Sequence, residues 1–285
     1  MNIMRLRPLF LVISLSLVLA SGYSIVRWGF RKSIDFAGGS VWELQFAKVA
    51  EKSFFEKAFI DNRVEIKNVV LSGNVATIRF DNVSQEEKVK IQAEIVKNNP
   101  EVKELKFETL GPSLGRELLV KTLWAIVLSS LALFVFIGSR FKDPVFGLSA
   151  VGAMFHDTFI LIGSFSILGR VVGAELDALF VTAMLTTLSA SVHDTVVTFN
   201  RMQELKLKNY QMGWIDLANR AVTETIVRSV NNSMTIMIML TALVILGGEV
   251  TRWFGVALLV GVICGTYSST GVAIPLVLWF KRQRK

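Results

Sequence analysis

The chain has 285 residues, of which 52% are hydrophobic and 19% are charged, against about 25% charged residues in an average soluble domain. This composition argues against a wholly soluble protein. The formal net charge is +8, but no basic stripe with interleaved aromatic residues points to a nucleic-acid partner. The single cysteine, Cys264, excludes an internal disulfide and a cysteine metal cluster.

Six stretches are long and apolar enough to cross a membrane, because a spanning helix needs roughly 20 mostly apolar residues. The first has a basic start and small residues near its end, as signal peptides do. No conventional secreted domain follows it, so we favour a retained span over a cleaved leader. The spans cover residues 9–28, 119–138, 144–169, 176–199, 229–247 and 253–280.

Basic residues cluster in the segments on one side of these spans, which is the signature of cytoplasmic loops. They are Arg5, Arg7, Arg140, Lys142, Arg201, Lys206, Lys208, Arg220 and the final KRQRK. We therefore expect both termini in the cytoplasm. The expected organisation is a cytoplasmic N-terminus and first span over 1–28, a periplasmic or other extracytoplasmic domain over 29–117, and five further spans over 118–285.

The segment between the first two spans has the pattern of a small α+β domain. Residues 40–46 alternate like a strand, residues 48–60 are amphipathic like a helix, and residues 64–80 resemble a β-hairpin with a Ser-Gly-Asn turn. A capping-box pattern begins a second helix over 84–98, and a last strand is expected over 102–110. The order βαββαβ predicts a ferredoxin-like fold. It contains no residue pattern typical of catalysis.

Polar residues recur at helical spacing inside the spans, which places them on single helix faces. Asp194 lies on such a face of the fourth span, and Arg228 lies on one near the start of the fifth. Gly261 and Gly265 form a GxxxG motif that permits close helix approach in the last span. The other residues of these faces are Thr187, Ser191, Thr198, Thr225, Asn232, Thr235, Thr266 and Ser269.

Asp194 and Arg228 are expected at similar depth on consecutive antiparallel helices, so a charge pair between them is geometrically feasible. An ionised group facing lipid costs on the order of 2.5–3.5 kcal/mol. An aspartate that alternates between a hydrated or Arg-paired state and a dehydrated one would bind and release a proton. We favour this interpretation of Asp194 over a static, neutral aspartate that only holds helices together.

The two histidines each precede an aspartate, in the pairs His156–Asp157 and His193–Asp194. His193 points about 100° away from Asp194 on the helix. Structural hydrogen bonding and proton relay remain open interpretations for His156 and Asp157. A metal site formed by all four residues fits no recognised ligand spacing.

Three motifs resemble those of a known family. SIDFAGGS (33–40) follows the first span, LGPSLGREL (110–118) leads into the second, and SVHDTVVTFNRMQE (191–204) leaves the fourth. Together with six spans and one outer domain, they resemble the SecF-type subunits of the SecD/SecF family, in the resistance-nodulation-division superfamily. The resemblance covers essentially the whole chain and implies half of such a transporter.

The resemblance implies a non-enzymatic subunit of the Sec protein-export machinery in the cytoplasmic (inner) membrane, with no cofactor. Together with a SecD-like subunit, it would use the proton motive force to assist preprotein translocation. Further implied partners are the SecYEG channel, YajC and YidC. The family's proton-handling aspartate matches Asp194 and its arginine matches Arg228. This chain has His193 where the family commonly has Asn, and Asn200 where it commonly has Asp.

The remaining motif residues favour structural roles, in turns before the first strand and before the second span. They are Asp35, Gly38, Gly39, Gly111 and Pro112. Residues 213–222 are expected to form a short amphipathic helix at the cytoplasmic surface.

Three other functions remain as alternatives. An intramembrane aspartyl protease would need Asp157 and Asp194 as a facing dyad, but the chain lacks the Gly-x-Gly-Asp context of such enzymes. A scaffold subunit of the translocon would conduct no protons. A small-solute/proton antiporter half of the same superfamily would normally carry larger outer domains.

Overall fold

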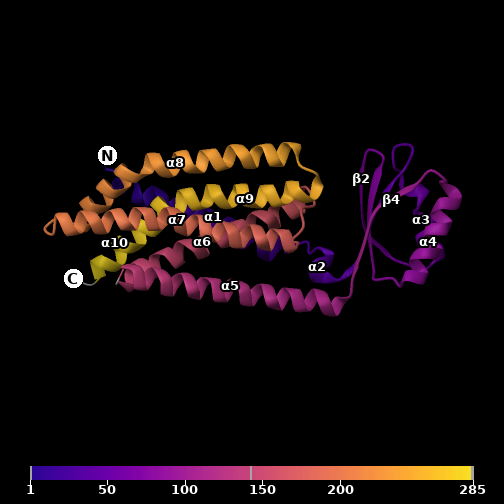
Figure 1. The fold of residues 1–285 in the computed structure, drawn as a ribbon, viewed down its shortest axis with the longest axis horizontal. Coiled ribbons are helices and arrows are strands. Elements are labelled where there is room, and N and C mark those ends of the chain that lie inside the picture. Colours follow the sequence, from indigo (N-terminus) through magenta and orange to yellow (C-terminus); the bar gives the residue numbers. More distant parts are fainter. Residues whose placement is uncertain (1, 142, 284–285) are drawn as a thin grey trace. The chain divides into compact units, whose positions relative to one another are not determined.

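A computed structural model describes residues 2–141 and 143–283 (Figure 1). The chain divides into two compact units, one formed by residues 32–123 and the other by residues 1–31 with 124–285. In the described ranges, six helical stretches are long and apolar enough to cross a membrane. The predicted class, a polytopic helical membrane protein with an α+β domain, is confirmed.

The spanning helices extend beyond the apolar stretches that predicted them. The last span is interrupted by the π-helical turn η3. The elements are η1 (Ile3–Leu6) and α1 (Arg7–Trp28), α5 (Pro112–Phe141), α6 (Pro144–Val171), α7 (Ala178–Lys208), α8 (Trp214–Leu246), and α9 (Glu249–Ser268), η3 (Ser269–Ala273) and α10 (Ile274–Gln283).

Aspartate side chains cap the starts of α6 and α7. Asp143 caps α6 by accepting from the Val145 N–H at 3.0 Å, and Pro144 occupies the first helical position, where its missing N–H costs nothing. Asp177 caps α7 by accepting from the Phe180 N–H at 2.6 Å. These caps satisfy donors that a helix start leaves unpaired.

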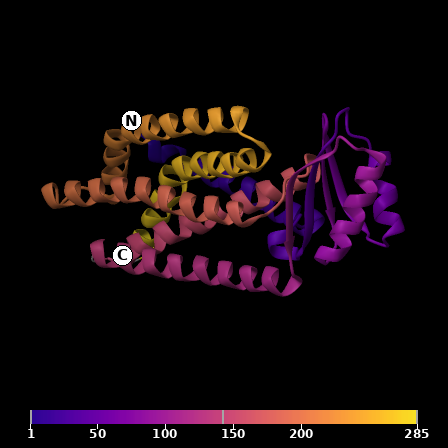
Figure 2. The ribbon, with the colours of Figure 1, turned by 45° about the vertical axis from the view of Figure 1, so that its right-hand side comes forward.

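The helices α6, α7 and α9 form the centre of the bundle. In α6, α7 and the last span, about half of the residues in the most apolar part of the helix are buried. In the corresponding parts of α5 and α8, 0% and 6% of the residues are buried. Figures 1 and 2 show α9 lying between α7 and α8. The outer surfaces of α5 and α8 are therefore available to lipid or to another protein.

The GxxxG motif brings α9 onto α7. A Cβ atom at Gly261 would lie 2.2 Å from Thr187 Cγ2, and one at Gly265 would lie 3.0 Å from Ser191 Cβ. Only glycine permits this approach, which sets the polar face of α7 directly against α9.

The π-helical turn η3 separates the two regular helices of the last span. Pro275 follows it and has no N–H for the carbonyl of residue 271, so the regular hydrogen-bond ladder is interrupted there. Such π-helical turns occur frequently at functional sites.

The separate unit of residues 32–123 has the predicted βαββαβ order. Its sheet is antiparallel with strand order β2-β3-β1-β4, as a ferredoxin-like fold requires. The elements are α2 (Ile34–Ala37), β1 (Gly39–Gln45), η2 (Lys52–Phe54), α3 (Glu56–Asp61), β2 (Ile66–Ser72), β3 (Val75–Phe80), α4 (Gln85–Asn98) and β4 (Lys103–Leu110).

The sheet packs its apolar face around Trp42, Phe59 and Ile91, all fully buried. The predicted capping box of α4 is present, since Ser84 and Glu87 bond each other's backbone N–H groups. The helix predicted over 48–60 is wrong in its first half. The Ala50 N–H donates to the Gly73 carbonyl at 2.9 Å, which ties this segment to the hairpin turn, and α3 begins only at Glu56.

The glycines of the first motif meet close neighbours. Gly38 has φ +72°, and a Cβ there would lie 2.8 Å from Pro112 Cα. Gly39 has φ +123°, and a Cβ there would lie 2.9 Å from the Phe80 carbonyl oxygen. Side chains are excluded at both positions by conformation and by space. The SIDFAGGS motif is therefore packed against the segment that begins at Gly111.

A separate surface helix over 213–222 is not observed. These residues start α8, which continues without a break to Leu246. Figure 2 shows the first turns of α8 at a steep angle to the rest of the helix.

Candidate functional site

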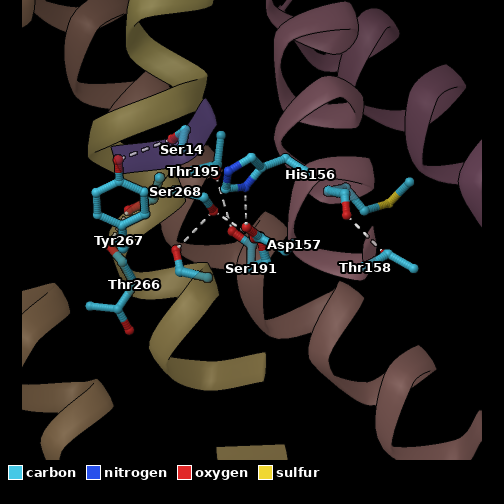
Figure 3. A network of polar contacts seen from close by, with 12 residues as sticks. Ser14, His156, Asp157, Thr158, Ser191, Thr195, Thr266, Tyr267 and Ser268 are labelled. Carbon is cyan, nitrogen blue, oxygen red and sulfur yellow. Dashed lines mark hydrogen bonds and ion pairs between the residues drawn. The ribbon is translucent and has the colours of Figure 1, made fainter. Parts of the chain in front are cut away.

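A buried carboxylate joins three helices at the centre of the bundle. Asp157 of α6 is 5% exposed. Its Oδ2 accepts hydrogen bonds from Ser191 of α7 at 2.6 Å and from Ser268 of α9 at 2.5 Å, and its Oδ1 lies 3.0 Å from His156 Nδ1 (Figure 3). A carboxylate without such partners would cost several kcal/mol in this interior, on the order of the 2.5–3.5 kcal/mol of insertion scales.

His156 extends the network toward the first span. Its side chain is 9% exposed, and its ring centroid lies 6.5 Å from that of Tyr267. The Tyr267 hydroxyl donates to the Phe10 carbonyl at 2.6 Å and lies 3.0 Å from Ser14 Oγ. His156 Nε2 is buried and has no hydrogen-bond partner among the described residues.

Asp194 lies one turn beyond Ser191 on α7 and is 8% exposed. It borders a cavity of about 20 Å³, and a single water needs about 10–15 Å³. The cavity therefore has room for one water, and its polar lining can hold that water. It is lined by Ala190, Ser191, Asp194, Asn232, Ser233, Ile236, Val262, Gly265 and Thr266.

Arg228 is exposed on the outer surface of α8. Within residues 2–141 and 143–283, no ion pair within 4.0 Å joins it to Asp194. Burial has the largest effect on the Asp194 carboxyl, and His193 and Arg228 also act on it electrostatically. Asp194 and Arg228 are thus close enough to interact electrostatically, but they do not form an ion pair in this conformation.

The other predicted polar positions separate into buried and exposed groups. Thr187 packs on Gly261, and Thr198 lies 3.3 Å from Thr225 across α7 and α8. Thr266 donates to Ser233 at 2.6 Å, between α9 and α8. Buried Ser269 bonds the Thr266 carbonyl within its own span, whereas Asn232 and Thr235 of α8 are exposed.

A stripe of exposed polar side chains runs along α7 and α8. We call it the polar face. The cavity beside Asp194 lies at this face, because exposed Ala190 and Asn232 both line it. The polar face consists of Thr182, Thr186, Ser189 and His193 on α7 and Arg228, Asn231, Asn232 and Thr235 on α8.

An ionic cluster links the same two helices at their other ends. Arg201 of α7 bonds Glu224 of α8 at 2.5 Å and Glu204 at 2.5 Å, and Arg220 bonds Glu224 at 2.9 Å. This cluster supplies charge next to Asn200, where the family commonly has an acid.

The two His–Asp pairs do not form a metal site. His193 is exposed, whereas His156 is turned toward Asp157 in the interior. Across the described part of the chain, no group of three His, Cys, Asp or Glu side chains is arranged to hold a metal ion. Asp157 accepts from two serines and Asp194 borders the cavity, and among the described residues no hydrogen bond joins the two carboxyl groups directly, unlike in a protease dyad.

Two residues of the site are absent from the predicted set. Ser268 donates to Asp157, and Ser233 accepts from Thr266. Ser268 continues the glycine face of the last span at spacings of four and three, after Gly261 and Gly265, and this signal could have found it.

A family model described as protein export membrane protein SecD/SecF, C-terminal, matches residues 90–283. SecF of Thermobaculum terrenum is 34% identical and is matched over 98% of this chain and 93% of its own length. SecF of Sebaldella termitidis is 32% identical over 100% of this chain and 93% of its own length.

Longer relatives contain the matching region as one part. SecDF of Bacillus subtilis is 29% identical, and the match covers 98% of this chain but 38% of the relative. The crystal structure of SecDF from Thermus thermophilus, described as a translocon-associated membrane protein, superposes with a TM-score of 0.87 at 27% identity. That match covers 99% of this chain and 39% of the SecDF chain.

Proposed function

The chain belongs to the SecD/SecF family of protein export membrane proteins, and on this premise we propose that it is the proton-coupled, SecF-type half of a protein translocase. It is a multi-pass membrane protein with full-length relatives that are translocase subunits. The observation that carries the proposal of proton coupling is the buried Asp194 beside a water-sized polar cavity.

The partner we propose is a SecD-type half that covers the polar face. Relatives named SecDF carry a region like this chain within a longer one, which supports such a pairing. Exposed Arg228 lies near the start of the fifth span, where it costs free energy against lipid, although less than the roughly 2.5–3.5 kcal/mol of a charge at the centre of a span. A protein partner that offers polar groups removes this cost, and it also closes the cavity beside Asp194.

The proton step follows from charge and burial. Ionised Asp194 is attracted toward Arg228, and this attraction ends when the carboxyl group is protonated and neutral. One elementary charge that crosses 100 mV releases about 2.3 kcal/mol. Interhelical hydrogen bonds in membranes contribute about 0.6–2 kcal/mol each, so one proton supplies enough energy to exchange one or two of them and repack α8 against α7.

We also propose a membrane orientation and a substrate for this chain. Both termini would lie in the cytoplasm and residues 29–117 outside it, which the distribution of basic residues in the loops supports. Repacking of the spans would move the outer unit, which pulls on or traps an emerging preprotein. The SecYEG channel, YajC and YidC are the proposed neighbours in this assembly.

The test measures preprotein export into vesicles that contain this chain, its SecD-type partner and the channel, with and without an imposed proton gradient. Asp194→Asn keeps the size of the side chain but cannot titrate, so it should abolish stimulation by the gradient while the subunits still assemble. Arg228→Met should weaken the stimulation. Asp216→Asn makes the same chemical change at the exposed start of α8 and should have no effect.

A scaffold subunit is the second candidate, because the ordered network around Asp157 would also hold helices together statically. It predicts full gradient-stimulated export by Asp194→Asn. That result would refute proton coupling through this residue.

A further inference from the structure

We propose that Asp157 is a second proton-binding carboxylate, connected to Asp194 through the hydroxyl of Ser191. The inference rests on the proton-coupled function proposed above and adds a second site to it. It is carried by a juxtaposition: Ser191 donates to Asp157 Oδ2 at 2.6 Å and also lines the cavity that Asp194 borders.

The route between the two carboxyl groups is short and polar. Ser191 and Asp194 are three residues apart on α7, so they lie on the same face. A water in the cavity would have the amide of Asn232 and the hydroxyls of Ser233 and Thr266 as further partners. These are the two to four polar neighbours that a buried water requires.

The proposed transfer changes only O–H bonds. Protonated Asp194 gives its proton to the cavity water, which passes one of its own to Ser191 Oγ. Ser191 in turn releases its hydroxyl proton to Asp157 Oδ2. Asp194 ends as a carboxylate and Asp157 as a carboxylic acid, and neither the water nor the serine carries a net charge afterwards.

The surroundings of Asp157 suit a group that changes its charge. In the described parts of the chain, no Lys or Arg forms an ion pair with it. The titratable groups around it are His156 on its own helix, Cys264 and Tyr267 on α9, and Asp194 on α7. From α1, the Ser14 hydroxyl and the Phe10 carbonyl join the network through Tyr267.

His156 can accommodate both charge states of its neighbour. Nδ1–H donates to Oδ1 of an ionised Asp157, and it can keep donating to Oδ1 after Oδ2 has received the proton. Which ring nitrogen carries the proton is normally set by the partner of the other nitrogen. Nε2 is buried without such a partner in the described residues, so no second bond fixes the tautomer.

The test uses infrared difference spectra of the complex in vesicles after a pH jump, which report protonation of carboxyl groups directly. Asp157→Asn should remove one titrating carboxyl band, and Asp194→Asn should remove a different one. Ser191→Ala should slow protonation of Asp157 on the order of 10²-fold, the usual effect of removing a positioned proton-transfer group. Ser191→Thr keeps a hydroxyl and should retain the rate.

Ser268→Ala is the matched control. It removes the other hydroxyl bonded to Asp157 Oδ2, at 2.5 Å, but Ser268 does not line the cavity. Its rate of protonation should stay at the wild-type value. Equal slowing by Ser191→Ala and Ser268→Ala would overturn the proposed route.

Spectra in which Asp157→Asn removes no titrating band would overturn the inference outright, even where Asp194→Asn abolishes gradient-driven export. Conversely, gradient-driven export that survives Asp194→Asn refutes the proposed function. The two failures are therefore distinguishable.

Discussion

Replacing Gly261 by alanine tests whether close packing of α9 on α7 holds the site together. The added Cβ would lie 2.2 Å from Thr187 Cγ2 and 2.5 Å from Thr187 Cβ. Non-bonded carbon atoms prefer about 3.5–4.0 Å, so rotation of the threonine cannot relieve the contact, and the helices must separate by about 1 Å. Overpacking of this kind costs about 1–3 kcal/mol.

The separation also reaches the carboxylate network. Asp157 is bonded at once by Ser191 of α7 at 2.6 Å and Ser268 of α9 at 2.5 Å. Hydroxyl hydrogen bonds span about 2.5–3.0 Å, so a shift of about 1 Å between α7 and α9 breaks at least one of them. Gly261→Ala should lower both the thermal unfolding midpoint in detergent and gradient-stimulated export in vesicles.

Gly138→Ala is the control, because a Cβ there meets nothing within 4 Å. It should be neutral or stabilise α5 by about 0.5–1 kcal/mol. Adding Thr187→Gly to Gly261→Ala removes the clashing side chain and should restore part of both losses. If Gly261→Ala behaves like Gly138→Ala in both measurements, α7 and α9 do not meet as described and the reasoning fails.

Two further predictions concern polar contacts at the surface. The backbone and hydroxyl of Ser84 lower the pKa of Glu87, so their stabilisation of α4 is present above the unfolded-state pKa and is lost as pH falls through the folded one. Ser84→Ala should speed hydrogen exchange of the α4 amides at neutral pH, and a difference that persists undiminished in acid would contradict this. Glu224→Gln removes the partner shared by Arg201 and Arg220. Because exposed pairs contribute about 0.2–1 kcal/mol each, the loss of stability should be small and should vanish in high salt; a large or salt-insensitive loss in thermal unfolding would argue against it.

The apolar spans and the strand order of the outer unit could be predicted because they depend on local patterns. Span positions follow from apolar length, and the βαββαβ order follows from alternation and turn residues. The capping box shows the same dependence, since its two members are three residues apart and need no tertiary partner.

The site was predicted less completely because its geometry depends on the registration of separate helices. Spacing places Asp194 on a polar face, but it does not say which neighbouring side chain that face meets. A charge pair with Arg228 was geometrically feasible, whereas in the structure Arg228 is exposed on α8 and no ion pair joins the two among the described residues. Ser268 was missed because the predicted polar positions of the last span were Thr266 and Ser269, whereas Ser268 lies on the face of Gly261 and Gly265.

The arrangement of polar groups supports the proposed pairing with a second half. Asp157 is bonded by groups of this chain on α6, α7 and α9. On the polar face of α7 and α8, Thr182, Thr186 and Thr235 bond carbonyls of their own helices. Exposed Arg228, near the start of the fifth span, still costs free energy against lipid, although less than the roughly 2.5–3.5 kcal/mol of a charge at the centre of a span. A second half that covers this face gains that free energy and at the same time isolates the cavity beside Asp194 from the bilayer. Assembly and proton coupling would then depend on the same surface, so substitutions that weaken the pairing should also uncouple export from the gradient.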